Sequence, residues 1–592
     1  MSDVKTINLT IDGTPVVAPE GTTILQAAET LGIHIPRLCY HPDLSLAGSC
    51  RVCIVEVKGM AQYMASCSVT VWEGMEVQTN SPEIRQARRD IIELLLDNHP
   101  RDCQTCERDG HCELQNLAYS HGVRERLFEG ERKRFALETS GVSVVRDSEK
   151  CVLCGRCVRV CAEVQGITNL SQHGRGFHTV VTPAHGATMD ESVCIQCGQC
   201  INVCPTAAFL EKDHTDDVWA ALANPELRVV VQTAPSIRAA IGEGFGLPPG
   251  TPCTGRMVTA LRRLGFDAVF DTDLGADLTI VEESAELLRR LDGGGPLPML
   301  TSCSPGWISF LEKFYPALIP HASTCRSPMT MLSALSKTYY AQKLGVDPSR
   351  IYMAAVMPCV AKKFEMRRPE HREADGSPMT DAVLTTREII WMIRCYGIDF
   401  ANLPEGEFDA PLGVATGAGD LFGTTGGVME ATLRTAACKL TGRAPETLEF
   451  EQVRGVLGGR WAGWREADVR IGDRTLHVGV ANGLHNAKNL LDQVIEGRKK
   501  FHVIEVMACP GGCIGGGGQP YPPTGERILD PELLRLRASA LYKIDAGKTL
   551  RLSHENPAVR EVYETFLGEI GGAKAHELLH TSYAARLPRG VR

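Results

Sequence analysis

The chain has 592 residues, too many for one hydrophobic core, so several domains are expected. Its 43% hydrophobic and 22% charged residues are typical of a soluble globular protein, and its net charge of −9 argues against a nucleic-acid binder. The sequence contains no run of about 18 apolar residues, so no membrane span is predicted. The N-terminus, MSDVKTINLTIDG, lacks the basic start and apolar core of a secretory signal, which predicts a cytoplasmic protein.

Cysteine is the unusual residue in this composition. The chain has 23 cysteines, and fifteen of them lie in the first 204 residues, in clusters with two or three residues between neighbours. In a large chain without a secretory signal, such spacing indicates metal ligation, and a disulfide framework is the less favoured alternative.

The first cluster falls in residues 1–79, where TINLTIDGTPVVAPEG predicts a β-hairpin and TTILQAAETLG a short helix. Small residues in the loop AGSCRVC would let backbone N–H groups approach the sulfur atoms of a cluster. The pattern resembles the [2Fe–2S] domain at the start of the large hydrophilic subunit of respiratory complex I, and four unrelated buried cysteines are the alternative. The expected ligands are Cys39, Cys50, Cys53 and Cys67.

The second cluster follows a helix predicted over IRQARRDIIELLLDNHP, within residues 80–139. No fourth cysteine lies close to its three cysteines, and the set resembles the His-Cys₃ [4Fe–4S] module of complex I and related enzymes. A neutral imidazole ligand removes one negative charge and should raise the reduction potential. His111 competes with His99 for this role, but His99 matches the pattern of the family. The expected ligands are His99, Cys103, Cys106 and Cys112.

Two copies of C-x₂-C-x₂-C-x₃-C occupy residues 151–161 and 194–204, within a predicted domain at 140–212. This is the pattern of two-cluster bacterial ferredoxins, in which the fourth cysteine of each copy ligates the other cluster. The insertion between the copies predicts a hairpin. The first third is therefore expected to transfer electrons without catalysing a reaction. The expected sets are Cys151, Cys154, Cys157 and Cys204, and Cys194, Cys197, Cys200 and Cys161.

Residues 213–529 alternate between strand-like runs such as LRVVVQTAPS and helical stretches such as SPMTMLSALSKTYYAQKLG. This alternation predicts an α/β domain with parallel strands, in which sites lie at the carboxyl ends of the strands. Three motifs fall at such ends: TSCSPGW (301–307), MPCVAKKFE (357–365) and EVMACPGGCIGGGGQP (505–520).

These motifs resemble the three signature segments of [FeFe]-hydrogenases, and the likeness extends over nearly the whole chain. It is greatest for the large catalytic subunit of multimeric, NAD(P)-linked, electron-bifurcating hydrogenases of anaerobes. The resemblance implies a multidomain α/β protein that catalyses 2H⁺ + 2e⁻ ⇌ H₂, with a small-subunit-like segment fused at 530–592. The implied cofactors are one [2Fe–2S] cluster, three N-terminal [4Fe–4S] clusters, and an H-cluster, which is a [4Fe–4S] cluster joined to a diiron unit with CO, CN⁻ and a dithiolate bridge.

The same resemblance assigns residues around the H-cluster. Cys359, Cys509 and Cys513 would be cluster ligands, with Cys513 bridging to the diiron unit. The glycine run 515–518 would let the backbone pass close to the cofactor. A flexible loop is the alternative, and the two spaced cysteines immediately before the run argue against it. Lys362 would hydrogen-bond one cyanide, Pro235 and Ser236 would hold the other, and Met357 and Met507 would form apolar walls.

The resemblance also implies a proton relay that begins at a cysteine beside the distal iron. Two of its members, Glu283 and Glu286, are three residues apart and so share one helical face. From the residues alone, such a pair would be read as solvated acids. The implied relay consists of Cys303, Glu283, Ser323 and Glu286.

One ligand departs from the family pattern. The commonest version of the first motif has two cysteines before the proline, whereas this chain has Cys303 followed by Ser304. Serine is a harder ligand than the thiolate that iron–sulfur clusters prefer. Because Cys325 stands where alanine is usual, we predict that Cys325 supplies the missing thiolate. Ligation by Ser304, or an inactive site, are the alternatives.

No dinucleotide fingerprint stands out, so NAD(P), flavin and a further [2Fe–2S] cluster would belong to partner subunits. Ferredoxin is a further expected partner, and maturation proteins would be needed to load the diiron unit. Three other functions are the alternatives. An electron-transfer subunit like that of complex I would be expected to lack Cys359, Cys509 and Cys513. A cytosolic iron–sulfur assembly factor lacks the long ferredoxin array, and a hydrogen sensor would carry a sensory domain.

Overall fold

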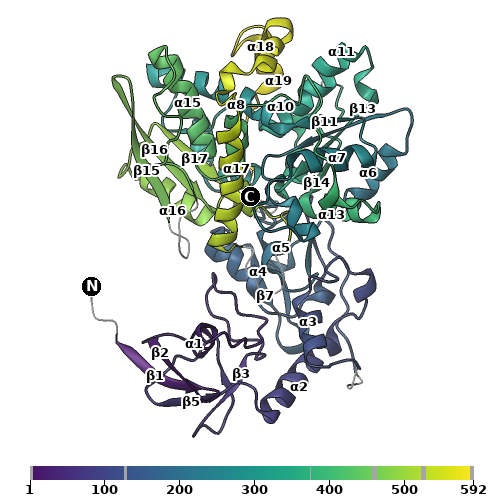
Figure 1. Ribbon diagram of the computed structural model, residues 1–592, viewed down its shortest axis with the longest axis vertical. Coiled ribbons are helices and arrows are strands. Elements are labelled where there is room, and N and C mark those ends of the chain that lie inside the picture. Colours follow the sequence, from purple (N-terminus) through teal and green to yellow (C-terminus); the bar gives the residue numbers. More distant parts are fainter. Residues whose placement is uncertain are drawn as a thin grey trace.

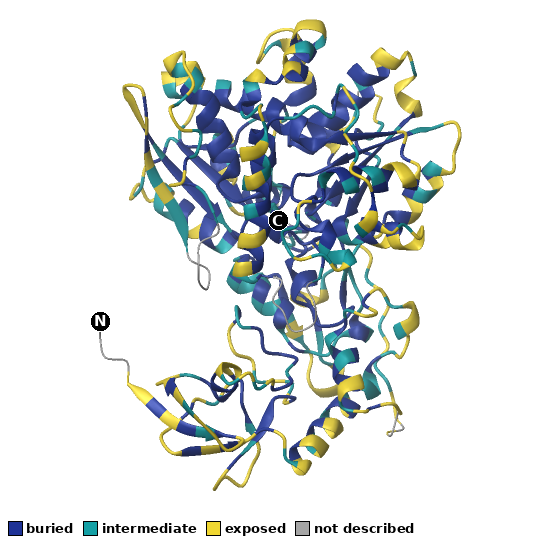
Figure 2. Cartoon of the chain, viewed as in Figure 1, coloured by how far each residue is buried: buried dark blue, intermediate teal, exposed yellow. Residues whose placement is uncertain are grey.

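The computed structural model describes residues 5–125, 128, 130–373, 375–455, 463–521 and 529–586. The first third of the chain forms the lower part of the molecule in Figure 1, and the remainder forms the larger upper part. Figure 2 shows that most of the buried residues lie in the upper part. Within the described residues, none of the helices combines the length and apolar character needed to cross a membrane.

A five-stranded sheet with the order β2-β1-β5-β3-β4 forms the N-terminal end. Its first two strands make the predicted antiparallel hairpin, and side chains along β1 alternate between exposed and buried because successive residues point to opposite faces. The predicted helix α1 begins at Thr23, which forms a capping box with Gln26. The elements are β1 (Thr6–Ile11), β2 (Thr14–Pro19), α1 (Ile24–Thr30), β3 (Ile54–Val57), β4 (Met64–Ala65) and β5 (Met75–Gln78).

Short helices and two antiparallel strand pairs follow. β6 pairs with β9 across the two cysteine repeats, and β7 pairs with β8 in the hairpin predicted for the insertion between them. The elements are α2 (Pro82–Asn98), α3 (Glu113–Ser120), β6 (Val144–Arg146), α4 (Arg156–Arg159), β7 (Leu170–His173), β8 (Val180–Pro183), α5 (Gln199–Val203) and β9 (Phe209–Glu211).

The upper part contains two four-stranded sheets rather than one. The first, with the order β11-β10-β13-β14, is entirely parallel, whereas the second, β12-β17-β16-β15, has one antiparallel edge strand. The strand predicted from LPMLTSCS is only two residues long. The strands are β10 (Arg228–Thr233), β11 (Ala268–Asp271), β12 (Met299–Leu300), β13 (Ile351–Met357), β14 (Ala382–Thr385), β15 (Trp464–Ile471), β16 (Arg474–Asn482) and β17 (Val503–Met507).

Helices cover these sheets and fill the space between them, where Figure 1 shows α8 and α17. The helices that accompany the strands of the two sheets are α6 (Thr215–Leu222), α7 (Thr254–Leu264), α8 (Thr272–Arg289), α9 (Pro305–Phe314), α10 (Pro328–Leu335), α11 (Ala341–Leu344), α12 (Ala361–Glu365), α13 (Thr386–Cys395), α14 (Gly417–Asp420), α15 (Gly427–Thr441) and α16 (Leu484–Ile495). The C-terminal segment contributes α17 (Pro531–Gly547), α18 (Pro557–Val562) and α19 (Ala573–Leu579). Its side chains Val559 and Leu578 enter the hydrophobic cluster that contains Leu278 of α8 and Met331 of α10.

One aromatic side chain joins the upper and lower parts. Tyr521, which follows the glycine run, lies between two guanidinium groups, with Arg108 at 3.6 Å and Arg387 at 4.4 Å from its ring centroid. Arg108 belongs to the segment between α2 and α3, and Arg387 belongs to α13. Cation–π contacts at this range are stabilising, so the ring fastens the segment after the glycine run to the first third of the chain.

A buried ion-pair network around Arg238 supports the upper part. This side chain is 1% exposed, and its guanidinium lies 2.6 Å from Asp271, 3.2 Å from Asp273 and 2.8 Å from Asp420. Removing one partner of a buried network leaves uncompensated charge in a medium that solvates it poorly.

We therefore expect Arg238→Ala to lower the free energy of unfolding by about 3–5 kcal/mol, measured by urea denaturation. Arg350→Ala is the control, since this exposed arginine pairs with Glu226 on the surface, where such a pair contributes roughly 0–1 kcal/mol. Equal losses in the two variants would contradict the interpretation.

Candidate iron–sulfur and catalytic site

The four N-terminal cysteines converge in the loops around β3. The side chain of Cys39 is hydrogen-bonded to those of Cys50 and Cys67, and Cys53 is hydrogen-bonded to Cys67. The Cys39 backbone N–H also donates to Cys50 Sγ at 3.3 Å. Four sulfur atoms within mutual reach, with a backbone donor beside them, fit the ligand set of a [2Fe–2S] cluster.

His99 has the properties of a metal ligand. It is 8% exposed, and its Nδ1 atom has no hydrogen-bond partner among the described residues. Burial, together with the nearby Lys150, lowers the pKa of the imidazole to about 4, which keeps it neutral. His111 instead faces the ring of Tyr521, at 6.1 Å between centroids. The orphaned nitrogen therefore supports His99 rather than His111 as the partner of the three cysteines.

The positions of the thiols in the two cysteine repeats are compatible with the predicted exchange of their fourth cysteines. The thiol of Cys204 lies close enough to those of Cys151, Cys154 and Cys157 to interact with them electrostatically. In the other set, Cys161, Cys194, Cys197 and Cys200 line a small cavity of about 30 Å³. Backbone N–H groups of residues 153, 169 and 196 each donate to a cysteine sulfur at 3.4 Å. The backbone donors fit a cluster in each set, and the second set also encloses a space.

The remaining cysteine group lies where β13 and β17 end. Cys509 is an electrostatic neighbour of Cys359, of Cys513 and of Cys197 in the ferredoxin-like part. Burial raises the pKa of all three catalytic-domain thiols, to about 12 for Cys513. Buried soft donors of this kind suit an iron–sulfur cluster, and the position of Cys197 brings a ferredoxin-type ligand set next to them.

The glycine run is tightly packed rather than flexible. A Cβ on Gly516 would lie 2.2 Å from the carbonyl oxygen of Pro358, and one on Gly517 would lie 2.6 Å from the carbonyl oxygen of Cys197. Such distances exclude any side chain. The sequence predicted that the backbone of this run passes close to a cofactor. The atoms that exclude a side chain here are instead backbone atoms of two other ligand loops. The run therefore holds Cys513 between these loops.

Other predicted residues surround the same space. The Lys362 ammonium donates to the Cys303 carbonyl oxygen at 3.3 Å and pairs with Glu365 at 2.6 Å. The buried Ser236 hydroxyl has no partner among the described residues, which leaves it available to a bound group. Met507 packs in one hydrophobic cluster with Cys303 against it. Met357 and Pro235 lie at the ends of β13 and β10.

The predicted relay begins with two buried neutral acids. Burial, together with the nearby Glu283 carboxyl, raises the pKa of the Cys303 thiol well above its usual value. Burial is also the main reason that the pKa of Glu283 rises to about 8, with Glu286 and Glu505 adding to the effect. Both side chains are therefore protonated at neutral pH and can each donate a proton.

The relay continues to a charged end. Ser323 Oγ donates to Glu286 Oε2 at 3.3 Å, and Thr324 donates to the same oxygen from both its N–H and its hydroxyl at 3.1 Å. Arg290 lies 2.6 Å from the other carboxylate oxygen of Glu286. The structure thus brings together all four residues of the predicted relay.

Ser304 and Cys325 point to different places. Ser304 is the N-cap of α9, and its hydroxyl accepts a hydrogen bond of 3.3 Å from the N–H of Ala508, the residue before Cys509. The ligand atom of Cys325 lies within 4.8 Å of those of Glu286 and His580. Cys325 is fully buried in a cluster with aliphatic residues of α8 and α10. This placement favours Ser304 over Cys325 as the neighbour of the cluster ligands.

Some residues of the site were not identified from the sequence. Arg290 lies four positions after Glu286 in the same helix, and this spacing is a signal of pairing that could have been used. Thr324 and His580 meet at 2.8 Å between Oγ1 and Nδ1, across 256 positions of the chain. No local pattern predicts such a contact.

Comparisons with known proteins find relatives over nearly the whole chain. Residues 227–517 match the family described as "Iron only hydrogenase large subunit, C-terminal domain". The NADP-reducing hydrogenase subunit HndD of Solidesulfovibrio fructosivorans is 49% identical over 98% of this chain and 99% of its own length. The chain belongs to the iron-only hydrogenases. Members of this family are oxidoreductases that act on hydrogen, and the multidomain organisation predicted from the sequence is confirmed.

The same family likeness extends to the other segments of this hydrogenase. Residues 4–82 match a 2Fe-2S iron-sulfur cluster binding domain, 88–126 an iron-sulfur binding region of NADH-ubiquinone oxidoreductase-G, 150–208 a 4Fe-4S dicluster domain, and 531–586 the iron hydrogenase small subunit. Iron hydrogenase 1 of Clostridium pasteurianum is 41% identical over 97% of this chain and 99% of its own. The apo form of a variant of [FeFe]-hydrogenase HydA1 from Chlamydomonas reinhardtii is 45% identical, with a TM-score of 0.56, over 63% of this chain and 99% of that one.

The pKa of Glu283 gives this hydrogenase a specific pH dependence of stability. Its folded-state pKa of about 8 exceeds the ordinary glutamate value of 4.5, so between these values the folded state binds more protons than the unfolded state, and stability falls as the pH rises. Glu283→Gln cannot ionise. We expect the melting temperature of this variant, relative to wild type, to increase from pH 5 to pH 8.5. A difference that does not change with pH would contradict the assignment.

Proposed function

We propose that this hydrogenase is the cytoplasmic catalytic subunit of a multimeric, NAD(P)-linked, electron-bifurcating enzyme of an anaerobe. Electrons would pass between the catalytic centre and ferredoxin or partner subunits that carry NAD(P), flavin and a further [2Fe–2S] cluster. The observation that carries this proposal is the continuous series of cysteine-rich ligand sets, from Cys39 at one end to Cys509 at the other. Its link to the centre is Cys197, which neighbours both Cys359 and Cys509. The likeness to a subunit of an NADP-reducing hydrogenase supports the partners proposed.

The residues described would hold one [2Fe–2S] cluster, three [4Fe–4S] clusters and an H-cluster whose diiron unit is delivered by maturation proteins. Cys359, Cys509 and Cys513 would ligate the H-cluster. Lys362 and the orphaned Ser236 hydroxyl would donate hydrogen bonds to its diatomic ligands. When bound, the group supplies the two-electron interconversion of protons and H₂.

The chain's own residues supply the protons. Cys303 holds a neutral thiol at the buried end, and Glu283 holds a carboxylic acid beside it. Ser323 can pass a proton because its hydroxyl both donates and accepts. Glu286, paired with Arg290, forms the charged end of the relay. Neutral groups in the buried part of the relay, and the counter-charge of Arg290 beside Glu286 at its end, would let protons move without leaving an unpaired charge in the interior.

The function is tested by H₂ evolution and uptake by the full chain, loaded anaerobically with iron–sulfur clusters and a diiron precursor. We expect Glu283→Gln to lower both rates by about 10²–10⁴-fold, the usual contribution of a positioned acid or base, with unchanged iron content. Glu282→Gln is the matched control on the same helix, because that carboxylate faces the C-terminal segment through Tyr563 and Gly571. No turnover by the loaded wild type would leave an electron-transfer subunit, and equal rates in the two variants would reject the relay.

We infer that the oxygen of Ser304, rather than the sulfur of Cys325, faces the fourth position of the H-cluster cubane. The inference rests on the hydrogen bond that Ser304 accepts beside Cys509 and on the contact of Cys325 with Glu286 and His580. A serine oxygen is a harder ligand than a thiolate, so one iron would be held less tightly.

Iron content and Mössbauer spectra of the catalytic cluster distinguish these ligands. We expect Cys325→Ala to keep a complete [4Fe–4S] subcluster, Ser304→Ala to lose iron or lower its occupancy, and Ser304→Cys to retain it. If only Cys325→Ala loses the subcluster, Cys325 is the ligand, as the sequence predicted, and the inference about Ser304 is wrong.

A further inference from the structure

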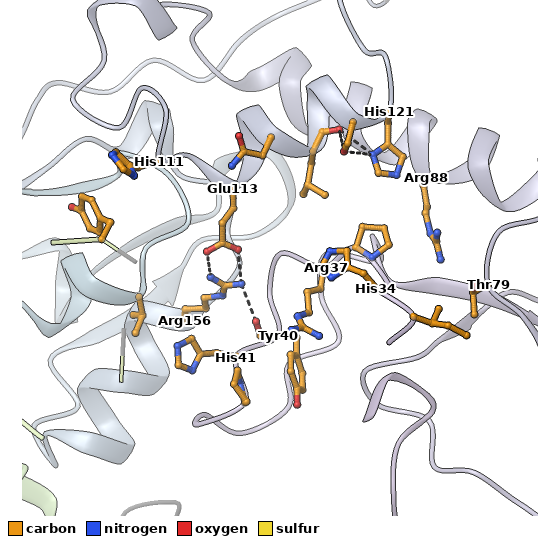
Figure 3. A pocket seen from close by; sticks show the side chains of 18 of the residues that line it. His34, Arg37, Tyr40, His41, Thr79, Arg88, His111, Glu113, His121 and Arg156 are labelled. Atoms are coloured by element: carbon orange, nitrogen blue, oxygen red, sulfur yellow. Dashed lines mark hydrogen bonds and ion pairs between the residues drawn. The ribbon is translucent and has the colours of Figure 1, made fainter. Parts of the chain in front are cut away.

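A cavity of about 620 Å³ lies in the lower part of the molecule, and its lining includes Tyr521 of the upper part but none of the cysteines. Residues from the N-terminal sheet region, from α2 and α3, and from the two-cluster region all line it, so it lies where three segments meet. Figure 3 shows Arg37, Arg88 and Arg156, which come from the N-terminal sheet region, from α2 and from the two-cluster region, around this space. Its volume falls in the range of roughly 300–1,000 Å³ that small-molecule sites occupy.

The lining is strongly cationic. Arg37, Arg88, Arg108 and Arg156 all border the cavity, against two acidic residues, Asp12 and Glu113. Glu113 is already engaged, since its oxygens lie 2.6 Å and 2.9 Å from Arg156. Arg37 pairs with Glu29 outside the cavity. Asp12 adds a nearby negative charge to Arg88, but none of the carboxylates of the described residues forms an ion pair with Arg88 or Arg108.

Arg88 and Arg108 have no ion-pair partner within the part of the chain that the structure describes. Each is only 4% exposed. Arg108 Nη2 donates to the Cys204 carbonyl oxygen at 3.0 Å, but its Nε and Nη1 have no hydrogen-bond partner, and neither has Arg88 Nε. Buried charged donors without partners are costly, so these groups at a cavity wall indicate an anionic ligand.

Part of this positive charge balances the iron–sulfur ligands. Arg88 interacts with Cys53, and Arg156 interacts with Cys154 and Cys39. That role accounts for positive charge near the clusters. It does not account for an open cavity, nor for two arginine side chains without ion-pair partners at its border. A ligand inside the cavity accounts for both.

We propose that this cavity binds a phosphate group, either a free phosphate anion or the phosphate of a nucleotide. Guanidinium groups present planar pairs of N–H donors that match phosphate oxygens. Arg108 is held in place by the ring of Tyr521 and by the Cys204 carbonyl, so its free donors are preorganised. Because the ligand would contact three segments at once, it would fasten the N-terminal sheet region to the rest of the chain. This site does not depend on the hydrogen chemistry proposed above.

The test is isothermal titration calorimetry on the full chain with its iron–sulfur clusters, at constant ionic strength set with chloride. The probes are inorganic phosphate, pyrophosphate and ADP. We expect saturable binding by the wild type and an affinity at least tenfold lower in Arg108→Gln. Arg88→Gln, at a second and separate position, should weaken binding in the same direction. Arg350→Gln, on the exposed surface of the catalytic part, is the matched control and should bind as wild type does.

Tighter binding of ADP than of pyrophosphate would assign the site to a nucleotide, and equal binding would assign it to the free anion. Absence of binding by the wild type would overturn the proposal. So would equal affinities in Arg108→Gln, Arg88→Gln and Arg350→Gln. If Arg108→Gln does not fold, the comparison of Arg88→Gln with Arg350→Gln alone decides.

Discussion

Burial of many thiol groups in one chain is the constraint on which the structure depends. A thiolate taken out of water loses solvation that only a metal ion or strong donors can replace. Burial raises the pKa of cysteines in both cysteine repeats and in the catalytic domain. Each ligand set is therefore placed in loops where backbone N–H groups reach the sulfurs, and strands or short helices hold those loops. The fold supplies the rigid ends from which the ligand loops project.

The same constraint shapes the proton relay. A buried site that moves protons cannot keep ionised groups along the whole route, because each would need its own counter-charge. Burial raises the pKa of Glu283, whereas Glu286, one helical turn further, forms an ion pair with Arg290. One helix, α8, thus presents two carboxyl groups in two different environments. The difference arises from what faces each group and not from the residue type.

The sequence predicted the parts of the structure that depend on local spacing. The cysteine repeats, the first hairpin and the ends of β13 and β17 are all encoded within about twenty residues, and the structure has them. The division into two sheets could not be read from the alternation of strands and helices, since β12 is only two residues long and pairs with the distant β17. Cys325 was predicted to be a ligand because alanine is usual at its position, but the direction of its side chain depends on α8, α10 and the C-terminal segment. The arginine-lined cavity likewise exists only because three segments fold against one another.

The position of Tyr521 between Arg108 and Arg387 has a consequence for the order in which the protein is completed. Arg108 is synthesised long before Tyr521, so the iron–sulfur end of the chain can already be formed when the last ligand loop emerges. The loop that carries Cys513 leads into Tyr521, so this loop is expected to dock onto a first third that has already folded. The contact between Arg108 and Tyr521 then helps to fix the position of the last ligand loop.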